Sequence, residues 1–84
     1  MKTVIQREFR IISIPVGLEV TIVFQDYFVT EPAVLVTVYD AVTEVDILCI
    51  QEEVLGVGEV YTKCILTFPS GYNGKRAAVM ICGQ

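Results

Sequence analysis

Polar and apolar residues alternate along most of this chain, and that period of two restricts its fold more than any other feature. Successive side chains of a β-strand point to opposite faces, so alternation predicts strands with one buried face. The clearest case is residues 18–25, where every second side chain is apolar. The residues expected to face inward there are Leu18, Val20, Ile22 and Phe24. The many Val, Ile and Thr residues also favour strands over helices, because β-branched side chains suit strands better.

The chain divides into six such segments, separated by turn signals such as Pro15-Val16-Gly17 and Asn73-Gly74. The expected strands are residues 2–14, 18–25, 33–40, 45–53, 59–68 and 75–82. Because 84 residues are too few for two stable cores, we expect a single domain over residues 1–84. Six to seven short strands without a helical segment predict an all-β fold, a small antiparallel β-sandwich, with a small barrel as the alternative.

Some segments depart from simple alternation. The first strand changes its apolar face near Arg10, which suggests a β-bulge or a crossing between sheets. Residues 26–32 are expected to form a connection that exposes Tyr27 and Phe28. Three further segments are apolar on both faces, namely residues 33–36, 47–50 and 77–82. Since 54% of the residues are apolar, which is high for so small a domain, we expect at least one of these segments to be covered by something outside the sandwich.

The charge is modest in size and uneven in position. A net charge of −4 argues against a nucleic-acid or anionic-membrane partner, because both require clustered basic residues. The basic residues gather near the two ends of the chain, and Lys63 alone opposes nine carboxylates between Ile11 and Gly74. This layout favours head-to-tail contact between copies, with ordinary surface charge as the alternative. The candidate interface residues are Arg7, Arg10, Tyr27, Phe28, Lys75 and Arg76.

Residues that carry chemistry are scarce. The chain has no His, and neither Ser13 nor Ser70 lies in a nucleophile motif. No glycine-rich phosphate loop is present either. We therefore expect no catalytic residues, no cofactor and no enzymatic activity. The carboxylates of Asp40, Glu44 and Asp46 gather near one turn, but their spacing fits no EF-hand, so a solvated acidic loop is favoured over a metal site.

Three cysteines, Cys49, Cys64 and Cys82, lack the spacing of a zinc site. If the hairpin turns through two residues at Gly56-Val57, Cys49 lies directly opposite Cys64, within the range that a disulfide tolerates. A three-residue loop would separate the two thiols. The alternative is a pair of small buried side chains, since free cysteine is commonly buried. Cys82 is expected to pack inside.

The segment 66–72, Leu-Thr-Phe-Pro-Ser-Gly-Tyr, resembles the corner before the penultimate strand of immunoglobulin-like and fibronectin-like domains. The resemblance implies an immunoglobulin-like sandwich in which Tyr72 holds the corner. The usual last strand would be missing, because only Gly83 and Gln84 follow Cys82. The exposed edge could accept a strand from a neighbour, with residues 1–14 as the donor. Alternatively, residues 1–14 fold back and complete their own sheet.

Small acidic sandwiches of this kind resemble virion decoration or capsid-cementing proteins of tailed phages, and also subunits of extracellular filaments. The resemblance implies a structural protein that binds copies of itself or a larger lattice such as a viral capsid, as a homo-oligomer. It further implies a location in a virion or an extracellular assembly, and in the cytoplasm before assembly. The residues themselves suggest no signal peptide, because polar residues at positions 6–8 and 10 interrupt any apolar segment near the N-terminus. The alternative function is an accessory module that recognises a protein or glycan through its loops.

Overall fold

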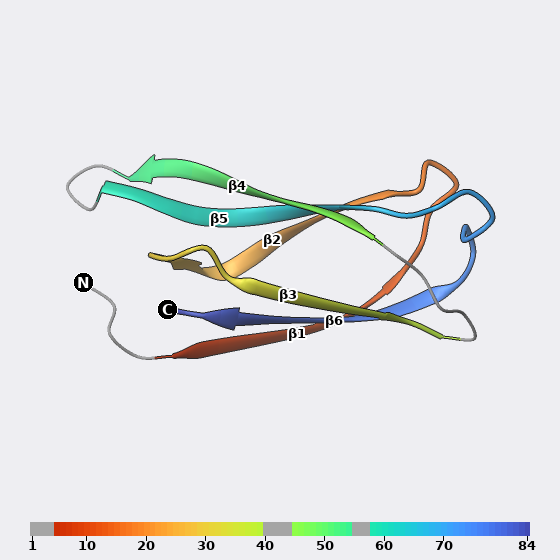
Figure 1. The fold of residues 1–84 in the computed structure, drawn as a ribbon, viewed down its shortest axis with the longest axis horizontal. Helices are drawn as coiled ribbons and strands as arrows, with labels where there is room; N and C mark the ends of the chain where they lie inside the picture. The colour runs from red at the N-terminus through yellow and green to blue at the C-terminus, as the bar shows by residue number, and fades with distance from the viewer. Residues whose placement is uncertain (1–4, 40–44, 55–57) are drawn as a thin grey trace.

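The computed structural model describes residues 5–39, 45–54 and 58–84, and these residues form six strands (Figure 1). The strands are β1 (Gln6–Ser13), β2 (Glu19–Phe28), β3 (Ala33–Val38), β4 (Asp46–Val54), β5 (Gly58–Thr67) and β6 (Arg76–Gly83). Every pairing between them is antiparallel. They lie in two three-stranded sheets, which we call sheet A (β1-β6-β3) and sheet B (β2-β5-β4). The predicted β-sandwich is confirmed.

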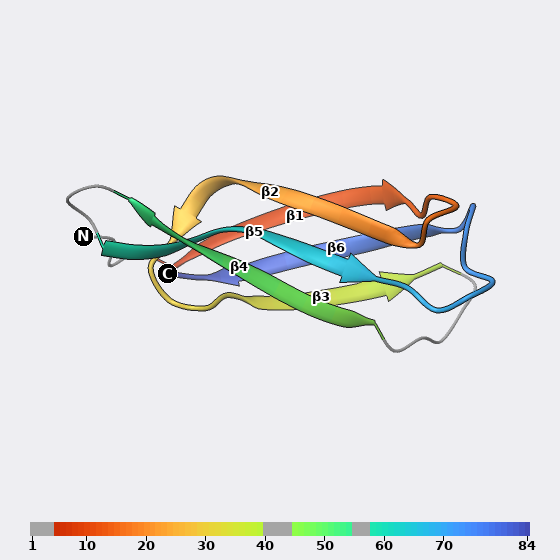
Figure 2. The ribbon, with the colours of Figure 1, turned by 90° about the horizontal axis from the view of Figure 1, so that it is seen from above.

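The strand order is that of an immunoglobulin-like sandwich with one exchange. In that fold the second, fifth and fourth strands share one sheet, and the third and sixth strands are neighbours in the other. Strands β2-β5-β4 and β3-β6 have this arrangement. The place of the seventh strand, beside β6, is taken by β1 (Figure 2). The N-terminal strand thus completes its own sheet, which is the second of the two alternatives set out above.

The predicted bulge in the first strand is wrong. All eight residues of β1 pair with β6 without a register shift, from Gln6 opposite Gly83 to Ser13 opposite Arg76. The apolar residues on the two faces of β1 instead belong to two different surfaces, the core and the outside of sheet A. Ile12 packs against the core, whereas Phe9 and Ile11 lie on the exposed outer face of sheet A. An apolar pattern on both faces therefore marks an exposed apolar surface here, and not a crossing between sheets.

The core lies between the sheets and is built from alternate residues of each strand. In β2, Ile22 and Phe24 are buried while Thr21 and Val23 are exposed, as the alternation predicts. In β6, the buried residues are Ala77, Val79 and Ile81. The other buried apolar side chains of this cluster are Ile14, Phe28, Val38, Cys64, Leu66 and Phe68. Contact across the sandwich thus comes mainly from β2, β5 and β6.

Phe28 corrects the expected connection at residues 26–32. β2 continues to Phe28, and the side chain of Phe28 is fully buried instead of exposed. Its ring packs edge-to-face on Phe24, with the ring centroids 5.0 Å apart and the planes at 81°. Gly83 makes room for this ring, because a β-carbon at residue 83 would lie 3.1 Å from the Cδ2 atom of Phe28. The neighbouring Tyr27 is half-buried.

Polar side chains of β1 form hydrogen bonds to the backbone of β2 and so link the two sheets. Arg10 donates a hydrogen bond to the carbonyl of Val23 (2.9 Å) and forms an ion pair with Glu8. Glu8 in turn accepts a hydrogen bond from the backbone N–H of Gln25 (2.8 Å). Gln6 donates to the carbonyl oxygens of Asp26 and Tyr27. These bonds occupy backbone groups of the β2 edge, a position where a foreign strand would otherwise pair.

Replacing Arg10 with methionine is expected to destabilise the fold by about 1 kcal/mol, because a charged hydrogen bond to Val23 and the pair with Glu8 are lost in a partly exposed place. Methionine keeps much of the apolar stem. The free energy of unfolding in urea measures the effect. Arg7→Met is the matched control, since Arg7 is exposed and makes no ion pair among the described residues. Equal losses of unfolding free energy in both variants would refute the role of Arg10 in linking β1 to β2.

Tyr72 lies in the corner between β5 and β6, as its resemblance to the immunoglobulin-like corner implies, and its side chain packs against the core. The backbone of the corner bonds internally, from the N–H of Lys75 to the carbonyl of Tyr72 (3.2 Å). It also bonds to the end of β1, where Ile14 receives the N–H of Gly74 and donates to the carbonyl of Lys75, both at 2.8 Å. Gly74 has φ of +84°, which glycine adopts without strain.

Candidate functional site: two exposed apolar sheet faces

The outer face of sheet A, which we call face A, is apolar and exposed. Side chains of β1, β6 and β3 alternate in register, so every second residue of each strand points away from the core. Phe9, Met80 and Leu35 form one row across the three strands. Their side chains are 57%, 43% and 65% exposed, respectively. The other face A residues are Arg7, Ile11, Ser13, Ala33, Thr37, Arg76, Ala78 and Cys82.

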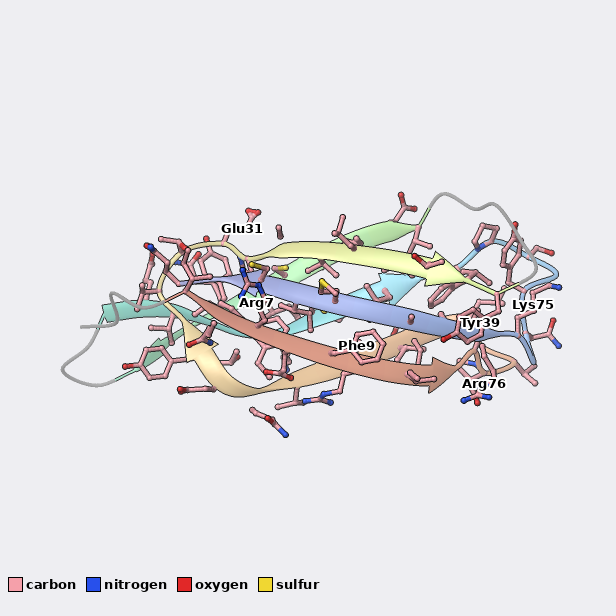
Figure 3. The ribbon with its side chains drawn as sticks, turned by 90° about the horizontal axis from the view of Figure 1, so that it is seen from below. Arg7, Phe9, Glu31, Tyr39, Lys75 and Arg76 are labelled. Carbon is pink, nitrogen blue, oxygen red and sulfur yellow. The ribbon has the colours of Figure 1, made fainter. Side chains whose placement is uncertain are left out.

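The charged strand residues of face A are basic and lie at its two ends. Figure 3 shows Arg7 at one end, Arg76 at the other, and Phe9 between them. Lys75 lies next to Arg76 and is half-buried. Glu31, in the loop between β2 and β3, is the carboxylate near the Arg7 end. Among the described residues neither Arg7 nor Arg76 forms an ion pair, so both guanidinium groups remain available to a partner.

Arg10 does not belong to this surface, although the sequence placed it with the interface residues. Arg10 has an even residue number in β1, and the even-numbered residues of this strand lie on the side opposite face A. Its guanidinium bonds to Val23 and Glu8 as described above. The sequence signal for the difference is parity: Arg7 and Phe9 share a face, and Arg10 lies on the opposite one.

The outer face of sheet B, which we call face B, is a second exposed apolar surface. Its centre holds Leu48 and Val23, both 61% exposed. Glu19 and Asp46 lie at one end of face B, each paired in register with Thr67. Neither carboxylate forms an ion pair among the described residues. The remaining face B residues are Thr21, Ile50, Lys63 and Ile65.

Both faces explain the high apolar content of the sequence. The three segments that are apolar on both sides put Leu35, Leu48 and Met80 on the outer faces, together with Ala33, Ile50, Ala78 and Cys82, while the residues that alternate with them face inward. Exposed apolar patches of this kind usually mark sites of association. Nothing within the described chain covers either face.

Cys49 and Cys64 are direct partners across β4 and β5, as predicted. The route differs from the prediction, because Val54 pairs with Gly58 and leaves three residues between them. A register shift between Ile50 and Gln51 compensates for the longer connection, so that Gln51 opposes Tyr61 and not the predicted Thr62. All three cysteines are free thiols in this structure.

The thiols differ in burial. Cys64 is fully buried, and Cys49 and Cys82 are half-buried. Burial is the main cause that raises the pKa of Cys64 to about 11, with smaller contributions from Cys49 and Glu8. Burial also raises the pKa of Cys49. A raised pKa lowers the fraction of thiolate, the nucleophilic form of cysteine, that each group carries at neutral pH. Cys82 lies on face A, opposite Arg7 and Ala33.

Alkaline pH is expected to destabilise the fold through Cys64. The unfolded thiol loses its proton near pH 9.0, whereas the folded thiol keeps it until about pH 11. The stabilising contribution is therefore complete below pH 9.0 and is lost as the pH rises through 11. Urea unfolding midpoints across this range measure the loss. Cys64→Val should show a smaller fall than the wild type, and an equal fall would assign the effect to other groups.

The remaining candidates of the sequence do not form a further site. Tyr27 and Phe28 do not make an exposed aromatic pair, because Phe28 is buried. Asp40 and Glu44 lie outside the described residues, and Asp46 is part of face B. Residues 5–39, 45–54 and 58–84 contain no group of three side chains that could hold a metal ion. The same residues include no helix long and apolar enough to cross a membrane.

Comparisons with known proteins give no relatives. No protein-family model matches the chain, and neither a curated protein nor a solved structure shows significant similarity to it. The candidate site therefore stands on the geometry and composition of the two faces.

Proposed function

We propose that this protein is a non-enzymatic structural subunit that assembles with other protein surfaces through face A. The observation that carries the proposal is the row of Phe9, Met80 and Leu35, which places three large apolar side chains in register on an exposed sheet face. Burying such a row would contribute a large part of the stability of an interface. The guanidinium groups of Arg7 and Arg76 at its ends, which form no ion pair within residues 5–39, 45–54 and 58–84, add charge selectivity.

A virion decoration or cement protein and an extracellular filament subunit are two forms of this proposal. Both use a small rigid sandwich as a building block, and they differ in the lattice that the block joins. The alternative, an accessory module that binds through its loops, has less support. Tyr27 and Phe28, the two aromatic residues expected to be exposed in the connection at residues 26–32, do not form a joint contact surface, because Phe28 belongs to the core.

Face A is tested by light scattering after size-exclusion chromatography over a range of protein concentrations. The wild type is expected to grow in mass with concentration, and Phe9→Glu to raise the apparent dissociation constant about tenfold or more, since a charge replaces a central apolar contact. The matched control is Val16→Glu, because Val16 is 85% exposed in the turn between β1 and β2, outside face A. A wild type that stays monomeric at every concentration and binds no lattice contradicts the proposal.

A further inference from the structure

The two faces carry opposite charge at the same end of the molecule. Arg76 lies at the start of β6 on face A, and Glu19 and Asp46 lie at the starts of β2 and β4 on face B. The chain itself fixes this arrangement. A short turn leads from Ser13, the partner of Arg76, to Glu19, so both residues lie at one end of the sandwich. Figure 1 shows the starts of these strands at that end.

We infer that copies of this protein stack head to tail, with face A of one copy on face B of the next and the strand ends aligned. The inference rests on the proposed function and specifies the partner surface. Such a stack brings Arg76 of one copy to Glu19 and Asp46 of its neighbour. It also places the apolar row of face A over the apolar centre of face B around Leu48 and Val23.

Charge distinguishes this stack from a symmetric pair. Two copies of face A facing each other would bring Arg7 and Arg76 onto a surface whose charged strand residues are also basic. That contact would desolvate guanidinium groups without pairing them, which costs free energy. It would also leave face B uncovered. The head-to-tail contact pairs Arg76 with the carboxylates of face B and covers both apolar faces.

The contact area is modest. The strands of sheet A have six to eight residues, about 20–26 Å at the usual rise per residue, and the shortest dimension of the molecule is 17 Å. A face of this size is smaller than the ~800 Å² that each partner buries in a standard protein interface, so each single contact is expected to be weak and the stack to grow with concentration. Because the two contacting surfaces differ, each added copy leaves one face free at each end of the stack, and the assembly remains open.

The test uses two variants that each block one face. Met80→Glu puts a carboxylate into the apolar row of face A, where stacking would desolvate it over the apolar side chains at the centre of face B. Leu48→Lys puts an ammonium group at the centre of face B, where it would meet the basic face A. Light scattering should give a growing series of masses for the wild type, a monomer for each variant alone, and a one-to-one dimer when the variants are mixed.

The outcomes separate the inference from the proposal beneath it. If Leu48→Lys alone still forms a dimer and the mixture forms no mixed pair, face A binds face A, so the inference is overturned while the proposed function stands. If the wild type is monomeric at every concentration, the inference fails, and the proposed function fails with it only when the chain also binds no larger lattice. Circular dichroism checks that each variant is folded. Phe9→Glu and Val23→Lys provide a second blocked pair, at side chains that are 57% and 61% exposed.

Discussion

Phe28→Ala will destabilise the domain by about 3–5 kcal/mol, which is the usual cost of truncating a buried aromatic side chain to alanine. A domain of this size has a total stability of about 5–10 kcal/mol, so the variant will unfold readily or fail to fold. Phe28 is fully buried and lies against residues of β2 and β6. Its ring packs on Phe24 of β2, and a β-carbon at Gly83 of β6 would touch it. Equilibrium unfolding in urea measures the loss.

The matched control is the same change at Phe9, whose side chain is 57% exposed on face A. Phe9→Ala should cost less than about 1 kcal/mol in a dilute, monomeric sample, because little buried area is lost. Comparable losses at both positions would show that residue 28 is exposed, as the sequence suggested, and would undermine the extent of β2. A control for aromatic contact is Phe24→Leu, which removes the ring pair and keeps an apolar side chain.

The misassignment of Phe28 shows where local reasoning stops. Residues 26–32 contain Asp26, Glu31 and Pro32, which are typical of a connection, and alternation alone does not tell a strand end from a loop. What buries Phe28 is a distant residue, Gly83, whose missing side chain leaves space for the ring. A contact between residues so far apart in the sequence cannot be inferred from the local pattern.

The pairing of Cys49 with Cys64 was predictable, whereas the loop length and the register shift that produce it were not. A two-residue loop would give this pairing without a bulge, and the structure reaches it through a longer connection and a register shift. Thr62 lies at this shift, and its buried hydroxyl has no hydrogen-bond partner among the described residues. A buried hydroxyl without a partner is unfavourable. Neither strand propensity nor the alternation of the sequence would therefore predict a register shift at this residue.

The sequence predicted that an apolar outer surface exists, but it did not show which strands form that surface. The pattern of residues 77–82 shows that both sides of the last strand are apolar, but it does not say which side is the core. The register with β1 and β3 decides this, since Ile81 lies between Glu8 and Val34 on the inner side. The sequence therefore indicated that an apolar surface existed, and the sheet order placed it on β1, β6 and β3.

Two single variants that place a glutamate at adjacent residues of β6 distinguish the core side of this strand from face A. Ile81→Glu is expected to abolish folding. Ile81 is fully buried, so the change loses about 2–5 kcal/mol of packing and also buries a carboxylate without a partner. The partner across β1 is Glu8, which adds like charge. Met80→Glu is expected to stay within about 1 kcal/mol of the wild type, because Met80 is 43% exposed.

Thermal unfolding and circular dichroism give the folded fraction of each variant, and light scattering gives its mass. The assignment of faces requires an unfolded Ile81→Glu chain beside a folded, dissociated Met80→Glu chain. If Met80→Glu unfolds and Ile81→Glu does not, the inner and outer sides of β6 are reversed, and face A ceases to exist as a surface. If both variants fold, residue 81 is not part of the core, and the inner side of β6 is assigned wrongly. The contrast thus ties the association surface to the same register that builds the core.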